Sequence, residues 1–188
     1  MWRKAVFLVL VSLLSSVSAQ EMTREEACKQ VYCRKGGVAV VNLPGDRHAS
    51  LDMTGMPVVV GRDVNIFPGE TLDLEPKVEK GQIVALTYVE KKRPAAKTIT
   101  ISFEQDKSVA EGVANGLGMR LIITNPFDRP LRYEAYIKTP DGKEEYSYTS
   151  SCPVHQGVSA VEEWPYPIEH LALVGFKFLP LAGDIVCE

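Results

Sequence analysis

The chain has 188 residues, of which 21 are basic, 24 are acidic and 45% are hydrophobic. A chain of this length buries about two-thirds of its unfolded surface, which is enough for the core of one ordinary domain. The slightly acidic balance lacks the basic footprint that nucleic acids and anionic membranes require, so neither is expected as a partner. If charge contributes to binding, it favours a basic partner or a cation.

The first 19 residues have the three parts of a secretory signal peptide. Arg3 and Lys4 form a positive start, residues 5–14 are almost entirely apolar, and the small residues VSA occupy positions 17–19. The apolar run is about half of the roughly 20 residues that a transmembrane helix needs. We therefore expect cleavage before Gln20, export to the periplasm or the medium, and a mature chain without a membrane span. Cleavage would leave 19 basic and 24 acidic residues, a net charge of −5.

All four cysteines, Cys28, Cys33, Cys152 and Cys187, belong to the mature part. An even number of cysteines in an exported chain predicts two disulfides. Their clustering towards the two ends favours Cys28–Cys33 together with Cys152–Cys187, while two other connectivities stay open. Because a helix turns about 100° per residue, the local bridge requires any helix to end between Cys28 and Cys33.

A short lead-in helix is expected over residues 23–34. Thr23 and Glu26 have the spacing of a capping box, and Gly36-Gly37 would end the helix. Beyond it, short apolar or alternating runs predict about ten strands. These runs are at residues 38–41, 58–60, 64–66, 72–74, 83–89, 99–103, 119–123, 131–137, 146–148 and 174–178.

Turn-forming sequences separate these runs, and Asp141-Gly142 is the strongest hairpin prediction. Many short strands with turns between them predict an all-β fold, an antiparallel β-sandwich of immunoglobulin-like architecture. The likeness is architectural, because the Cys-Trp-Cys spacing of true immunoglobulin domains is missing. We expect residues 20–188 to form one domain, with the polar stretch 104–116 as the place for a boundary if there are two. Residues 91–97 are expected to form an exposed turn.

The established motifs of nucleotide binding, metalloproteases and serine hydrolases do not occur in the chain. The nearest approach to a nucleophile elbow, around Ser159, lacks its second glycine, so we interpret it as an ordinary turn. Glu162 and Glu163 are adjacent, and neighbours on a strand point to opposite faces. The protein is therefore expected not to be an enzyme. A small hydrolase is kept as an alternative, and it would need His155 or His170 to meet a nucleophile.

One group of residues resembles part of a zinc site. Cys152 and His155 are three residues apart, and Cys187 with His170 would complete two thiolate and two imidazole ligands. In an oxidising compartment a disulfide is the favoured interpretation of these cysteines.

A second group has donors that suit copper(I). His48, Met53 and Met56 lie close together in the sequence, and thioether and imidazole ligands bind this ion. The two methionines are equally good fillers of a core. We predict no cofactor, and copper or zinc handling is kept as an alternative function.

The sequence Trp164-Pro165-Tyr166-Pro167 is the most unusual local feature. Its prolines exclude a central strand and stiffen an extended segment. Trp164 and Tyr166 are therefore our candidate binding surface, since exposed aromatic rings are frequent anchors at interfaces. The alternative is that both rings turn inward and close one end of the sandwich.

Together these features predict an exported, non-enzymatic module that binds another envelope or secreted protein. Loops at one end of the sandwich, or an exposed sheet edge, would make the contact. An envelope accessory protein, or an acidic inhibitor or immunity-type protein, is the concrete form of this hypothesis.

Overall fold

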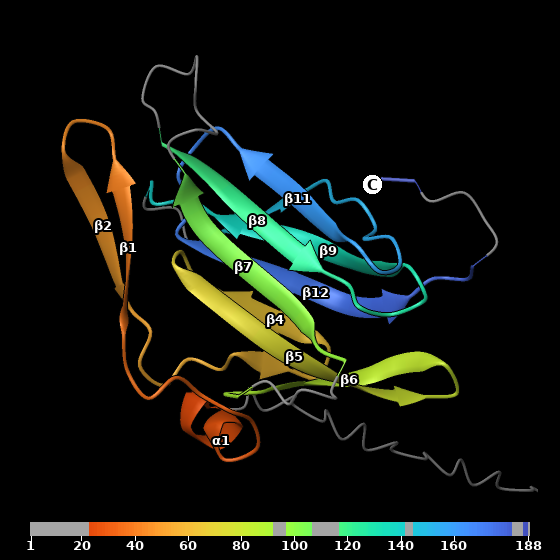
Figure 1. Cartoon of the computed structure of the whole chain (residues 1–188). Coiled ribbons are helices and arrows are strands. Elements are labelled where there is room, and N and C mark those ends of the chain that lie inside the picture. The colour runs from red at the N-terminus through yellow and green to blue at the C-terminus, as the bar shows by residue number, and fades with distance from the viewer. Residues whose placement is uncertain (1–22, 92–96, 107–116, 142–144, 182–185, 188) are drawn as a thin grey trace, which may run out of the picture.

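The computed structural model describes residues 23–91, 97–106, 117–141, 145–181 and 186–187. The predicted signal peptide and Gln20 lie outside these residues. The elements in chain order (Figure 1) are α1 (Arg24–Cys28), β1 (Val38–Leu43), β2 (Arg47–Asp52), β3 (Val59–Val60), β4 (Asp63–Ile66), β5 (Glu70–Glu79), β6 (Gln82–Tyr88), β7 (Ile99–Asp106), β8 (Gly118–Thr124), β9 (Leu131–Lys138), β10 (Ser147–Thr149), β11 (Ser159–Trp164) and β12 (His170–Phe178).

The strands form two packed five-stranded sheets and a separate two-stranded hairpin (Figure 1). One sheet, here called the β9 sheet, has the order β10-β9-β12-β4-β3, and the other, the β7 sheet, has the order β11-β8-β7-β5-β6. The pairs are antiparallel throughout the described residues. The predicted all-β sandwich is thus confirmed, whereas its immunoglobulin-like character stays a prediction.

The core lies between the inward faces of the two sheets. Period-two alternation puts Ile99, Ile101 and Phe103 of β7 inside, each fully buried, and does the same for Leu131 and Ala135 of β9. Burying an aliphatic or aromatic side chain of this size contributes about 1.5–3 kcal/mol to stability. The alternation that predicted these strands is therefore also what builds the core.

The predicted hairpin around Asp141 has the expected partners. β9 pairs with β10, with Tyr136 opposite Tyr148, although residues 142–144 of the turn lie outside the described part. β7 and β8, on either side of the proposed boundary at 104–116, pair with each other, and residues 104–106 are the end of β7. Most of the stretch 91–97 also lies outside the described residues.

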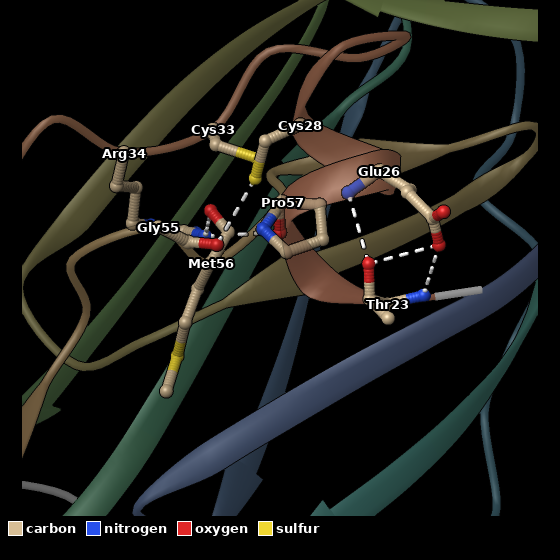
Figure 2. The surroundings of a disulfide bond; sticks show 8 residues. All are labelled: Thr23, Glu26, Cys28, Cys33, Arg34, Gly55, Met56 and Pro57. Atoms are coloured by element: carbon tan, nitrogen blue, oxygen red, sulfur yellow. Dashed lines mark hydrogen bonds between the residues drawn. A yellow bond between two sulfur atoms is a disulfide. The ribbon is translucent and has the colours of Figure 1, made fainter. Parts of the chain in front are cut away.

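The N-terminal segment is held by a capping box and a disulfide (Figure 2). The Thr23 amide donates to the Glu26 carboxylate at 2.9 Å, and the Glu26 amide donates to the Thr23 hydroxyl at 3.3 Å. α1 ends at Cys28, which is bonded to Cys33. Residues 29–34 are not helical, so the predicted helix is too long. The helix stops at Cys28 because the disulfide holds Cys33 in an extended conformation, in which it forms a β-bridge with Pro57.

The second disulfide joins Cys152 to Cys187, 35 residues apart in the sequence. The two bridges are the pairing that the clustering of the cysteines favours. Two disulfides are typical of proteins in an oxidising compartment outside the cytoplasm. In the described part of the chain, no helix has the length and apolar character needed to cross a bilayer.

A buried ion pair fixes the segment that leads into β1. Arg34 is 6% exposed and makes a two-point contact with the Glu70 carboxylate, at 2.6 and 2.7 Å. Nη2, one of the two nitrogens that contact Glu70, also donates to the Asn65 carbonyl at 2.7 Å, and the third nitrogen, Nη1, donates to the Met56 and Pro57 carbonyls at 3.3 and 3.1 Å. The guanidinium lies 4.8 Å from the centre of the Phe67 ring. A fully bonded, planar arginine of this kind holds the start of the hairpin against the β4–β5 turn.

Candidate interaction site

The β1–β2 hairpin stands beside the sandwich, at the end where β7 finishes and β12 begins (Figure 1). Its inner face buries Ala39 and Val41, each 2% exposed, and lies against Glu169 just before β12. At its far end, the Gln105 amide accepts from the Asn42 backbone N–H and donates to the Asn42 carbonyl, both at 2.9 Å. The side chain thus supplies the two bonds that a neighbouring strand would make, and it ties the hairpin to β7.

Among the described residues, two larger cavities lie between the hairpin and this end of the sandwich. The first, here called the tip cavity, has a volume of about 530 Å³. Its hairpin wall includes Leu43, Pro44 and Arg47, and its sandwich wall includes Pro140, Tyr166 and Pro167. The second, here called the base cavity, has a volume of about 280 Å³ and lies near the start of the hairpin.

The tip cavity contains part of the predicted binding surface. Tyr166 is 39% exposed and, with Pro167, forms one wall. Prolines on both sides of the cavity have fixed φ angles, so the rim has little conformational freedom to lose. On the hairpin side, Arg47 is exposed and its Nε donates to the Pro44 carbonyl at 3.0 Å.

Trp164 does not share this surface. The side chain is 6% exposed, its ring meets the Phe103 ring edge-on at 6.4 Å, and its Nε1–H donates to the Thr149 hydroxyl at 3.0 Å. As the last residue of β11, it follows the inward alternation of that strand. This corrects the candidate surface: Tyr166 is on it and Trp164 is in the core.

The base cavity is built around His170, a side chain that is 6% exposed. The ring lies 4.4 Å from the Phe67 ring, and its Nδ1 is 2.6 Å from the Tyr146 hydroxyl. Burial lowers the pKa of His170 to about 4, and the positive charges of Arg34 and Lys138 act in the same direction. Burial also raises the pKa of Tyr146. At neutral pH, Tyr146 therefore donates to an uncharged imidazole.

The remaining polar groups of the base cavity have opposite charges. Lys138 and Glu169 form an ion pair at 3.2 Å, with side chains 29% and 19% exposed. The Asn65 side chain adds an amide, and its backbone carbonyl is occupied by Arg34. His170 Nε2 is buried without a hydrogen-bond partner in the described structure.

The other candidate catalytic residues, His155 and Ser159, lie apart from both cavities. His155 is exposed in the loop before β11, and Ser159 is exposed on β11 with its hydroxyl 2.8 Å from that of Thr124. His170 faces Tyr146 and Phe67 instead.

Glu162 and Glu163 face opposite sides of β11, as their adjacency predicted. Glu163 is exposed and pairs with Arg120 at 2.9 Å. Glu162 turns inward, where it accepts from the Tyr133 hydroxyl at 2.6 Å and from the Cys152 backbone N–H at 3.2 Å. Burial raises the pKa of the Glu162 carboxyl.

Neither of the two metal-binding alternatives has its ligands together. Cys152 and Cys187 are bonded to each other, so their sulfurs are not thiolate ligands. His48 is exposed near the hairpin turn and Met53 follows the other end of β2, about 13 Å or more along the strand. Met56 lines the base cavity. Across the described ranges, no three His, Cys, Asp or Glu side chains converge as a metal site.

Comparisons with protein-family models, with curated proteins and with solved structures found no match. The class of the protein is therefore defined by its own features: a two-disulfide β-sandwich with a hairpin packed beside one end. The tip cavity and the base cavity lie between that hairpin and the sandwich.

Proposed function

We propose that the protein is an exported, non-enzymatic interaction module that binds another envelope or secreted protein through its tip cavity. The observation that carries the proposal is the half-open cavity of about 530 Å³ walled by Tyr166 and prolines of three separate segments. An immunoglobulin-like arrangement of the two sheets, with binding by loops at one end, belongs to the same proposal.

Binding at the tip cavity has a low entropic cost. A tyrosine has two rotatable side-chain bonds, and the neighbouring prolines restrict the backbone, so little freedom is lost when a partner binds. The apolar wall provided by Leu43, Pro44 and Pro140 offers a place for one apolar side chain of the partner. Aromatic anchors in such pockets carry much of the binding energy at protein interfaces.

The charge of the mature chain, −5, supports a basic partner. Opposite net charges accelerate association with a basic partner, and repulsion between like charges suppresses encounters with acidic proteins. An inhibitor or immunity-type protein for a basic secreted enzyme is one form of this function, and an envelope accessory protein is the other.

Export is part of the proposal, and the purified protein tests it. Protein recovered from the envelope or medium is expected to begin at Gln20 and to contain no free thiol. Intact-mass measurement with and without alkylation checks both points. Two or more alkylated thiols in the native protein would contradict the disulfide assignment.

The binding site is tested by capture from envelope extract with three forms of the mature protein. Tyr166→Ala is expected to weaken capture of the protein that the wild type captures at least tenfold, without changing the melting temperature of the mature protein. Val161→Ala is the matched control, because Val161 is 55% exposed on β11, away from both cavities. Equal capture by Tyr166→Ala and wild type would reject the tip cavity as the binding site.

A further inference from the structure

The base cavity has no role in the proposed interaction, yet it combines apolar walls with polar groups. Leu51 and Met56 come from the hairpin and the loop after it, and Phe67 comes from the β4–β5 turn. Its volume of about 280 Å³ is slightly below the range of about 300–1,000 Å³ typical of sites for drug-sized ligands. The cavity therefore fits a single small ring.

The charges in the cavity favour a neutral ligand. Lys138 and Glu169 neutralise each other across 3.2 Å, and His170 is uncharged at neutral pH. The Glu169 carboxylate would repel an anion, and the Lys138 ammonium would repel a cation. The ammonium, the carboxylate and the Asn65 amide together provide donors and acceptors. Such a mixture suits a ring with several hydroxyl groups.

Two tyrosines extend the site along the outer face of the β9 sheet. Tyr146 is 48% exposed and Tyr148 is 51% exposed, and residues two apart on an extended strand share a face about 6–7 Å apart. Both rings are held in place: Tyr146 by its hydroxyl contact with His170, and Tyr148 by an edge contact with the Tyr136 ring at 5.6 Å. The exposed faces of fixed aromatic rings pack well against the C–H faces of sugar rings.

We propose that the base cavity and the exposed Tyr148 ring bind a neutral oligosaccharide. One sugar ring occupies the cavity beside Tyr146, and its hydroxyl groups bond to Lys138, Glu169 and the Asn65 amide. The next ring stacks on Tyr148. This site goes beyond the proposed protein interaction, because it uses a different cavity and different tyrosines.

Isothermal titration of the mature protein tests this proposal with defined sugars. The probes are the trisaccharides cellotriose, maltotriose and N,N′,N″-triacetylchitotriose and the corresponding monosaccharides. Leucine, a zwitterion, and sodium acetate, which supplies an anion, are the comparison ligands. At least one trisaccharide is expected to bind, at least tenfold more tightly than its monosaccharide. Tyr148→Ala should abolish that tenfold advantage and leave monosaccharide binding unchanged. Glu169→Gln should weaken the binding of both the trisaccharide and its monosaccharide by about tenfold.

Tyr166→Ala is the matched control, since this tyrosine is also exposed but lines the tip cavity. It should bind the trisaccharide like the wild type even where it no longer captures the protein partner. The two proposals therefore fail separately. Absence of saccharide binding would overturn the inference, as would binding of leucine or acetate alone. The same holds for a trisaccharide advantage that survives Tyr148→Ala.

Discussion

The buried, uncharged state of His170 predicts that acid destabilises the folded protein. Its pKa is about 4 in the folded chain and about 6.5 when the chain is unfolded. Between these values the unfolded chain binds a proton that the folded chain does not, so stability falls as the pH falls. Relative to alkaline pH, the titration of His170 lowers the free energy of unfolding by about 2 kcal/mol at pH 5 and by about 3 kcal/mol at pH 4.

Replacement of the histidine by a side chain that does not titrate isolates this effect. His170→Gln keeps an acceptor for the Tyr146 hydroxyl, so the variant is expected to retain the fold. Urea unfolding of both proteins at pH 7, 5 and 4 gives the difference in unfolding free energy at each pH. We expect the wild type to lose about 2–3 kcal/mol more than the variant between pH 7 and pH 4.

The comparison with the variant removes the contributions of other groups. The raised pKa of Glu162 has the opposite sign, because its penalty appears as the pH rises through that pKa, and it is common to both proteins. A difference between wild type and variant that does not change with pH would refute the reasoning. So would an NMR titration in which the His170 ring of the folded protein becomes protonated near pH 6.5.

Four further variants test the packing described above. Trp164→Ala should cost about 3–5 kcal/mol, whereas Tyr166→Ala should stay within about 0.5 kcal/mol, as measured by thermal melts; similar losses in the two would contradict their different burial. Removing both Cys152 and Cys187 should lower the free energy of unfolding in urea by about 4 kcal/mol, because the bridge closes a 35-residue loop; an unchanged urea midpoint would argue against the bridge. Glu70→Gln should cost about 3–5 kcal/mol by leaving a buried guanidinium without its charge partner; a change below 1 kcal/mol would mean that this pair is not buried.

The strands that build the core were predictable because their inward residues are apolar. The run from Ile99 to Phe103 alternates without exception, and the structure buries each apolar position. β2 and β11 were missed for the converse reason. β2 reads RHASLD and β11 contains Glu162 and Glu163, so neither has the apolar alternation typical of a half-buried strand. Their pairing with β1 and β8 supplies the order that their own sequences lack.

Of the candidate sites, the sequence indicated Tyr166 but not its surroundings. Tyr166 lies beside Leu43 and Arg47 only because the hairpin folds back on the end of the sandwich. This brings together residues that are more than 100 positions apart in the sequence. Likewise, Tyr146, just before β10, and His170, the first residue of β12, approach within 2.6 Å across the intervening β9. Residues on neighbouring strands meet through register, and local patterns do not specify register between distant strands.

The central claim, that a protein partner occupies the tip cavity, is tested most directly by site-specific photocrosslinking in the cells that export the chain. A photoreactive phenylalanine analogue at position 166 would stand in the cavity wall, and the same analogue at position 161 would stand on exposed β11. We predict a discrete adduct with a second envelope or secreted protein from position 166 and none from position 161. The absence of an adduct at position 166, or the same adduct from both positions, would contradict the claim.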